Sequence, residues 1–279
     1  MRDLAINILE FLSDSFGENF TSYSNVVAEK TVRERAAQLS LNNTSYFRLV
    51  CSDPAEASTF ARMLRVRYSI FFRDALPFAF LGSVILPSMI CSCQNGSFRA
   101  WSAACAGGEE TYSLAILLDE LLLQSETRPH IQLFGTDIAE DALDEARAGI
   151  YSSDRLGAVT LNRIKNYFVA QKNRYRLKEE LRQKVIFSRH DLLSQRSYAP
   201  PESIFGGFDL ILCRNFLMYL DEKAYSQVCD NLFRALKPDG ILMLGTAETL
   251  PERHSMFFEK VFESGCMYRK KNVSRSHLC

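Results

Sequence analysis

The stretch RAWSAACAGGEETYS, residues 99–113, decides the fold expected for this chain. An apolar run enters a turn of small residues and leaves it as an amphipathic segment. Small residues let the backbone approach a ligand closely, and the start of a helix offers unpaired N–H groups. Glu109 and Glu110 fall in the first helical turn, where they favour the helix dipole but repel a pyrophosphate. The turn therefore suits a ligand that carries positive charge, although a simple tight turn remains the alternative.

Outward from this stretch, short apolar runs alternate with longer amphipathic ones. Such alternation predicts a parallel sheet with helices on both faces. The expected strands are 98–103, 131–136, 208–213 and 241–244, and the expected helices are 109–124, 140–148 and 221–236.

Between Ile150 and His190 the alternation is interrupted. A helix is expected at 160–168, with short strands at 174–177 and 184–188. This region is either an enlarged connection between a strand and a helix or a small inserted subdomain, which we place at about 151–190.

Residues 1–90 have a different character, and we expect a small helical domain followed by a linker. Apolar residues recur at helical spacing near the start, and further helices are expected at 23–39 and 58–68. Pro77 and Pro87 then indicate a connector, and residues 91–279 form the expected sheet domain.

The bulk composition excludes several classes of protein. The 33 basic and 33 acidic residues leave no net charge, which argues against nucleic-acid binding by bulk charge. The eight cysteines form no CxxC pair and the four histidines lie at no zinc-ligand spacing, so we expect reduced cysteines and no metal. We also expect no uncharged apolar run of about 18 residues, hence no membrane insertion and a cytoplasmic protein.

Polar residues follow two of the expected strands. Asp137 ends the second strand, where doubly wound folds bind ribose hydroxyls, although it also suits a helix N-cap. Arg214, Asn215 and Tyr219 follow the strand at 208–213. Because ligands bind at the carboxyl edge of such sheets, these side chains are candidates for a nucleoside site, although those after 208–213 could instead only make hydrogen bonds within their loop.

A further candidate lies before the sheet domain, in SIFFRD at residues 69–74. Two aromatic residues would anchor this stretch while Arg73 projects, and arginine forms bidentate pairs with carboxylates. Taken alone, the stretch favours a surface salt bridge for Arg73. Upstream, Arg62, Arg65 and Arg67 form either a patch that faces an acidic partner or an ordinary solvated helix face.

Taken together and in this order, these stretches resemble the chemotaxis-receptor methyltransferase family, CheR. The resemblance rests on RYSIFFR (67–73), WSAACAGGEETYS (101–113), TDI (136–138) with ARAGIY (146–151), FDLILCRNFLMYL (208–220) and LKPDGILMLGTAE (236–248).

The resemblance implies an α/β fold: a Rossmann-like class I methyltransferase sheet with a small all-helical N-terminal domain and a small inserted β-subdomain. It implies S-adenosylmethionine as cofactor and S-adenosylhomocysteine as product. Arg73 and Tyr219 would face the reacting carboxylate, and the implied cofactor contacts are Ser69, Arg73, Glu110, Asp137, Asp191, Leu192, Arg214 and Asn215.

Three positions depart from the family pattern. Arg67 and Asp191 both stand where the family has asparagine, and the compact segment 167–181 lacks the glycine-bearing loop of members that dock a receptor tail peptide. Asp191 can still accept a hydrogen bond from an adenine amino group, whereas Arg67 cannot act as an acceptor. Tail-peptide tethering is therefore not implied.

The implied reaction is transfer of a methyl group to a glutamate γ-carboxylate in the cytoplasmic helical region of chemoreceptors, by a monomeric enzyme. Two alternatives stay open: a related methyltransferase that acts on another protein in a non-chemotactic pathway, and a non-catalytic signalling module that senses the cofactor. Catalysis is favoured by the retention of four residues: Arg73, Arg214, Asn215 and Tyr219.

Overall fold

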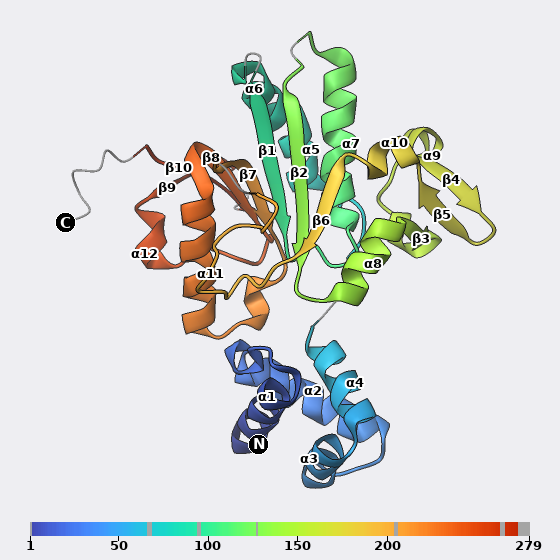
Figure 1. Cartoon of the computed structure of the whole chain (residues 1–279), viewed down its shortest axis with the longest axis vertical. Helices are drawn as coiled ribbons and strands as arrows, with labels where there is room; N and C mark the ends of the chain where they lie inside the picture. Colours follow the sequence, from blue (N-terminus) through green and yellow to red (C-terminus); the bar gives the residue numbers. More distant parts are fainter. Residues whose placement is uncertain are drawn as a thin grey trace. The chain divides into compact units, whose positions relative to one another are not determined.

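The computed structural model describes residues 2–65, 69–93, 96–126, 128–203, 206–262 and 266–272 (Figure 1). The contacts within the chain divide it into two units. The helical unit comprises Met1–Val66 with Phe216–Val228, and the sheet unit comprises Arg67–Asn215 with Cys229–Cys279.

The helical unit is built from short amphipathic helices around an apolar core. Its elements are α1 (Arg2–Phe16), η1 (Phe20–Ser22), α2 (Asn25–Gln38), α3 (Asn43–Ser52), α4 (Pro54–Leu64), η4 (Leu217–Tyr219) and the first half of α11 (Glu222–Ala235). The helix expected at 58–68 begins earlier because Asp53 caps it, accepting a hydrogen bond from Ala55 N at 2.9 Å, and Pro54 occupies the first helical position.

The proposed arginine patch is only partly present in this unit. Arg62 is exposed, but Arg65 forms an ion pair with Glu18 and lies over the ring of Phe20. Arg67 lies outside the described residues. Arg65 therefore does not share a solvated face with Arg62, and the patch of three arginines stays a prediction.

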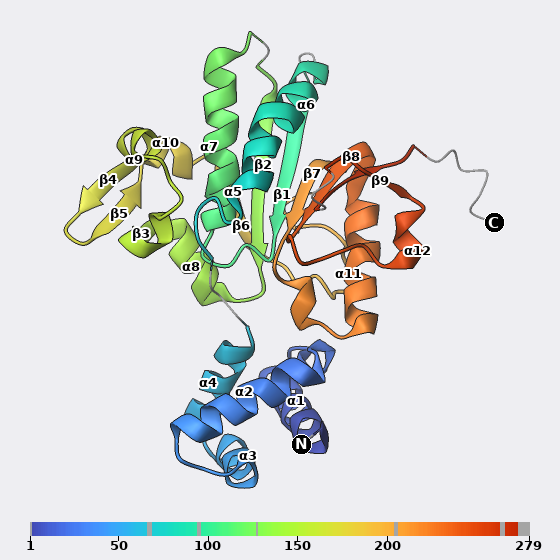
Figure 2. The ribbon, with the colours of Figure 1, turned by 180° about the vertical axis from the view of Figure 1, so that it is seen from behind.

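The sheet unit contains a mostly parallel sheet of seven strands in the order β6-β2-β1-β7-β8-β10-β9. Helices α5, α6 and α7 lie over the face turned toward the viewer in Figure 2. The strands are β1 (Ser97–Ala103), β2 (His130–Asp137), β6 (Val185–Arg189), β7 (Phe208–Cys213), β8 (Leu236–Leu244), β9 (Phe258–Lys260) and β10 (Met267–Lys270). Strand β10 pairs antiparallel with both β8 and β9. The helices include α7 (Glu109–Gln124), α8 (Glu140–Ala148) and α12 (Glu252–Ser255).

The expected α/β, Rossmann-like fold class is confirmed. α7, α8 and β7 have the bounds expected from the sequence, because each is set by a clear change of hydrophobic period. Strand β8 starts earlier than expected, since the Lys237–Gly240 turn lies within it as an irregularity with Asp239 at φ 62°.

The expected connector around Pro77 and Pro87 is wrong, and so is the expected absence of an 18-residue apolar run. Ala75–Ser92 is helical throughout and carries no charged residue; it comprises α5 (Ala75–Phe80), a π-helical stretch (Leu81–Ile85) and α6 (Leu86–Ser92). Pro87 lacks an N–H and crowds the preceding turn, and the wider π turn directly before α6 accommodates it.

This helix is the one segment of the described chain that is long and apolar enough to cross a membrane, a test that core helices also pass. One face is buried in the sheet unit: Phe78, Leu81 and Ile90 belong to the same hydrophobic cluster as residues of β1, β7 and α7. The sequence expectation failed because Pro77 and Pro87 predict an interruption of this apolar run, and composition alone does not separate a core helix from a membrane span.

The expected inserted region contains a separate three-stranded antiparallel sheet, β3-β5-β4. Its elements are β3 (Ile150–Ser152), η3 (Ser153–Leu156), α9 (Leu161–Tyr167), β4 (Phe168–Gln171), β5 (Arg174–Leu177) and α10 (Glu179–Arg182). The strand expected at 184–188 is β6, which pairs with β2 in the main sheet, so the small sheet ends before residue 185.

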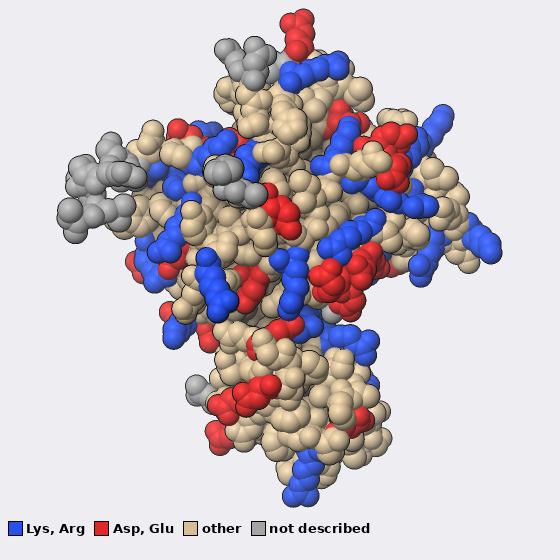
Figure 3. Space-filling view, viewed as in Figure 1, with Lys and Arg blue, Asp and Glu red and all other residues tan. Residues whose placement is uncertain are grey.

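The insertion is also strongly basic. Residues 150–184 contain 9 lysines and arginines against 3 acidic residues, and basic side chains project from the outer end of the insertion in Figure 3. The zero net charge of the whole chain therefore conceals a local excess of positive charge.

Candidate functional site

The carboxyl ends of β1, β2 and β7 meet at one edge of the sheet, and the backbone there is strained. Ala104 (φ 56°) and Ala106 (φ 46°) adopt left-handed conformations in the turn after β1, and Asn215 (φ 57°) does so after β7. Such conformations cost about 1–3 kcal/mol each for residues other than glycine and concentrate at functional sites. The strain marks this edge as the candidate site.

Asp137, at the end of β2, ties the turn after β1 to its own strand. Its Oδ2 accepts a hydrogen bond from Ala106 N at 2.9 Å, and its Oδ1 accepts one from Ala139 N at 3.0 Å. The N-cap role expected for Asp137 is wrong, because Ala139 is the N-cap of α8 and no side chain caps that helix; the second contact is a local one to the residue before the helix. A carboxylate at this strand end is of the chemical type that accepts hydrogen bonds from a ligand's hydroxyl groups.

Glu110 lies in the first turn of α7, and the residues around it hold its carboxylate. Ser102 Oγ donates to Glu110 Oε1 at 2.8 Å, and Arg214 Nη1 lies 3.4 Å from Oε2. Burial raises the pKa of Glu110, while Arg214 and Ser102 oppose that rise by stabilising the charged form. The site thus holds a carboxylate in a setting where a nearby cation would be strongly attracted.

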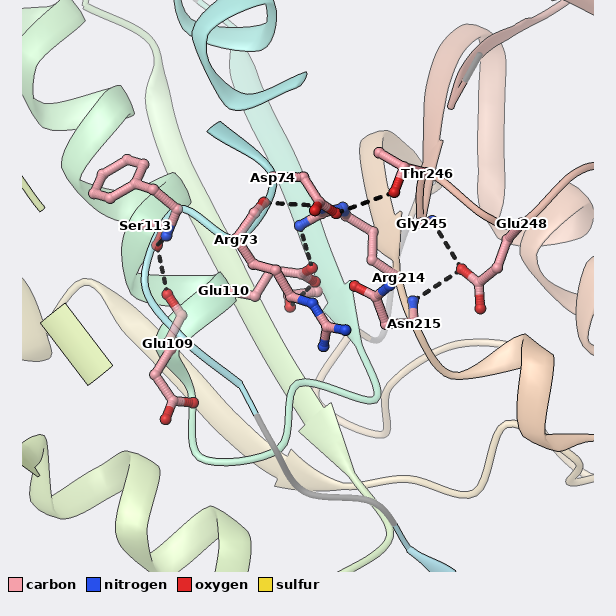
Figure 4. A network of polar contacts seen from close by, with 12 residues as sticks. Arg73, Asp74, Glu109, Glu110, Ser113, Arg214, Asn215, Gly245, Thr246 and Glu248 are labelled. Carbon is pink, nitrogen blue, oxygen red and sulfur yellow. Dashed lines mark hydrogen bonds and ion pairs between the residues drawn. The ribbon is translucent and has the colours of Figure 1, made fainter. Parts of the chain in front are cut away.

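Arg214 contacts the segment that carries Arg73 (Figure 4). Its Nη2 donates to the carbonyl of Arg73 at 3.0 Å and to Asp74 Oδ2 at 2.8 Å, and its guanidinium lies 5.1 Å from the ring centroid of Phe78. The Arg214 side chain is 1% exposed. Its guanidinium therefore fixes the Arg73–Asp74 backbone and the Glu110 carboxylate together.

The segment around Arg73 is strained as well. Phe72 (φ 52°) and Asp74 (φ 60°) flank it in left-handed conformations. Phe72 N donates to Ser113 Oγ at 2.9 Å, and Ser113 Oγ donates to the carbonyl of Glu109 at 2.7 Å. The loop is thereby fastened to the first turns of α7, and the Arg73 side chain extends past Glu110 in Figure 4.

Asn215 is held by a residue that sequence reasoning did not select. Glu248 Oε2 accepts hydrogen bonds from Asn215 N and from Gly245 N, both at 2.8 Å. A Cβ at Gly245 would lie 2.7 Å from that oxygen and 2.9 Å from Asn215 N, so only glycine fits. The signal was present in the sequence, because Glu248 ends the LKPDGILMLGTAE stretch.

Asp191 and Leu192 follow β6, beside the end of β2. His190 N donates to the carbonyl of Asp137 at 3.1 Å, which places the two strand ends together. Asp191 Oδ1 accepts from Leu193 N at 2.9 Å, and the carbonyl of Leu192 accepts from Asn231 Nδ2 at 3.0 Å. Both residues therefore reach the same sheet edge as Asp137.

The structure brings most of the expected residues to this edge, and their individual roles stay predictions. Ser69 belongs to the sheet unit, where its carbonyl accepts a hydrogen bond from Arg155 Nη1 at 2.9 Å. Tyr219 belongs to the helical unit, where its carbonyl accepts from Ser24 N at 2.8 Å. Its expected place beside the reacting carboxylate stays a prediction.

A second carboxylate, Glu109, is buried at the start of α7 and was not selected as a site residue. It is 0% exposed and forms an ion pair with Arg155 of η3. Burial raises its pKa to about 7, against the opposing effect of Arg155. The sequence showed the acidic helix start but not the partner, which comes from the insertion.

The donor set at this edge suits S-adenosylmethionine. Glu110 and Asp137 present carboxylate oxygens, which complement a sulfonium or ammonium charge and the donor hydroxyls of a ribose. A Cβ at Gly107 would lie 3.1 Å from Glu109 Oε2 and 3.2 Å from Glu145 Oε2, so a larger residue would have to displace these two carboxylates slightly. Within the described ranges, no group of three or more His, Cys, Asp or Glu side chains could hold a metal ion.

Comparisons with known proteins point to one family. A family model described as CheR methyltransferase, SAM binding domain, matches residues 67–265. A chemotaxis protein methyltransferase of Borreliella burgdorferi is 27% identical over 256 residues, covering 89% of this chain and 89% of that protein. Chemotaxis protein methyltransferase 1 of Pseudomonas aeruginosa is 32% identical over 207 residues, covering 73% of each.

A longer relative is also similar. An uncharacterized 104.1 kDa protein of Rhodobacter capsulatus, from the hypE 3′ region, is 30% identical over 245 residues. The match covers 87% of this chain but only 25% of that protein.

Proposed function

The chain belongs to the CheR methyltransferase family, and from that premise we propose that it forms γ-methyl esters on glutamate side chains of chemoreceptors. The observation that carries the carboxylate as substrate is Arg73, an arginine on a strained loop fastened beside the acidic cofactor edge. We place the substrate glutamates in the cytoplasmic helical region of the receptor, and the enzyme in the cytoplasm as a monomer.

The residues that would hold the cofactor mostly follow the ends of β1, β2, β6 and β7, and Ser69 and Arg73 would join them from the segment before α5. Asp137 would accept from the ribose hydroxyls, Glu110 would face the positive charge, and Asp191 would accept from the adenine amino group. Ser69, Leu192, Arg214 and Asn215 complete the proposed contacts. When bound, S-adenosylmethionine supplies a methyl group on a sulfonium centre, and S-adenosylhomocysteine is the product.

Arg73 would bind the glutamate side chain by charge-assisted hydrogen bonds and orient it. A glutamate carboxylate is already ionised at neutral pH, so the residues of this chain need not remove a proton. Their task is to align the carboxylate and to exclude water. A loop that fixes the position of Arg73 serves this task, and no general base is required. Tyr219 is proposed to face the same carboxylate.

The proposal is tested by incubating the protein with methyl-labelled S-adenosylmethionine and a cytoplasmic chemoreceptor fragment, followed by mild base. A glutamate ester predicts label that base releases as methanol. A matched fragment whose candidate glutamates are replaced by alanine should take up no label. Base-stable label would point to nitrogen methylation and contradict the ester.

A further inference from the structure

The inserted subdomain contacts the Arg73 loop along its length. Arg155 Nη1 donates to the carbonyl of Ser69 at 2.9 Å, and the carbonyl of Arg155 accepts from Phe71 N at 3.0 Å. Both are contacts to the backbone that leads into Arg73. One residue of η3 therefore fastens the loop at two points.

Aromatic packing reinforces these contacts. The ring of Phe71 meets Tyr151 of β3 edge-on at 4.9 Å and Phe168 of β4 at 5.3 Å, measured between ring centroids. The guanidinium of Arg163 lies 4.3 Å from the ring centroid of Phe72. The segment before Arg73 is thus packed against the insertion as well as against α7.

The same insertion also holds the cofactor turn. The hydroxyl of Tyr151 donates to the carbonyl of Gly107 at 2.7 Å, and the guanidinium of Arg155 pairs with the buried Glu109 carboxylate. Arg155 Nη1 therefore contacts two segments that are far apart in sequence: the loop before Arg73 and the start of α7.

We infer that Arg155 is a positioning residue, which sets the Arg73 loop against the cofactor turn through its contacts with Ser69 and Glu109. The inference rests on the proposed function, because it assigns Arg73 to the carboxylate substrate. It makes the inserted subdomain part of the catalytic framework. A displacement of about 1 Å at a reacting group can lower the rate about a hundredfold, so contacts that fix the position of the Arg73 loop affect catalysis.

The ion pair between Arg155 and Glu109 should depend on pH. The groups that face Glu109 are Arg155 from η3, Glu145 from α8, the hydroxyl of Tyr151 and the thiol of Cys105. Arg155 is the cation among them, and the pKa of Glu109 is raised to about 7 by burial. At lower pH the Glu109 carboxylate is protonated and loses the negative charge that pairs with Arg155. The rate of methyl transfer should therefore rise as the pH rises through about 7.

The test measures kcat/KM for methyl transfer to the receptor fragment, with cofactor affinity measured separately. Arg155→Met should lower kcat/KM by about tenfold to a hundredfold. Arg155→Lys should recover part of that loss, because lysine keeps the charge but lacks the fork. In a double-mutant cycle, Arg155→Met should cost less than about twofold in an Arg73→Ala background, since it acts through Arg73.

The pH profile separates positioning from mere folding. The wild type and Arg155→Lys should gain activity between about pH 6 and about pH 8, whereas Arg155→Met and Glu109→Gln should show a flat profile there. The exposed Arg174 of the same insertion gives the matched control, and Arg174→Met should keep the wild-type profile and cofactor affinity.

Fully additive losses in the double-mutant cycle, or a wild-type pH profile in both Arg155→Met and Glu109→Gln, would overturn the inference. If Arg155→Met does not fold, Glu109→Gln and Arg155→Lys still decide it through their profiles. Failure of the proposed function is a different result, in which the wild-type protein itself forms no base-labile ester.

Discussion

Glu109→Gln removes a buried carboxyl group whose ionisation is unfavourable in the folded protein, and this should change how the stability depends on pH. The carboxyl is 0% exposed, and burial raises its pKa from 4.5 to about 7. Between these values the folded protein keeps a proton that the unfolded chain has released, so stability falls as pH rises. At 1.36 kcal/mol per pKa unit, the shift corresponds to about 3 kcal/mol.

The assay is urea unfolding of the wild type and Glu109→Gln at about pH 5 and about pH 8, analysed by linear extrapolation. The wild type should lose about 2.5 kcal/mol more than the variant between the two conditions, because the unfolded carboxyl is already mostly ionised at about pH 5. The exposed Glu180 gives a matched control, and Glu180→Gln should follow the wild type. Equal pH dependence in the wild type and Glu109→Gln would refute the buried carboxyl as the cause.

Three further predictions follow from individual contacts. Asp137→Asn should weaken cofactor binding, measured by calorimetry, by about tenfold or more, because the amide loses one acceptor oxygen; unchanged affinity would exclude the ribose role. Arg214→Lys should lower methyl transfer by about tenfold or more, because lysine cannot bridge the Arg73 carbonyl, Asp74 and Glu110 at once. A variant that loses thermal stability but keeps wild-type methyl transfer would contradict this. Leu81→Ala should lower the free energy of unfolding in urea by about 2–5 kcal/mol, because Leu81 is fully buried. Val84→Ala, on the exposed side of the same helix, should lower it by less than about 1 kcal/mol, and similar losses in both variants would contradict the burial of Leu81 in the core.

Much of the sheet unit could be predicted because its sequence signals are local. The apolar run 208–213 and the amphipathic run 109–124 each have a clear period and clear ends, and both elements have the expected bounds. The helical stretch Ala75–Ser92 was missed because two prolines normally interrupt helices. A π-helical turn before Pro87 is a tertiary compromise, and no local pattern announces it.

The candidate site divides in the same way. Asp137 and Glu110 were found because strand ends and helix starts in this architecture lie at the ligand edge. The partners that orient the site were not found: Asp74 and Arg155 act through contacts with residues distant in sequence, such as Arg214 and Glu109. Which charged side chains pair across such distances depends on the packing of the insertion and the loop, and the sequence carries no spacing rule for it.

The most direct test of the account compares cofactor affinity and methyl transfer in Arg73→Ala. If Arg73 binds the carboxylate that is methylated, transfer to the receptor fragment should fall by about a hundredfold or more, as expected when one partner of a buried charge-assisted contact is lost. Affinity for S-adenosylmethionine should change by less than about fivefold, because Glu110 and Asp137 remain. Transfer that persists, or that falls only in proportion to cofactor affinity, would contradict the assignment of Arg73 to the substrate carboxylate.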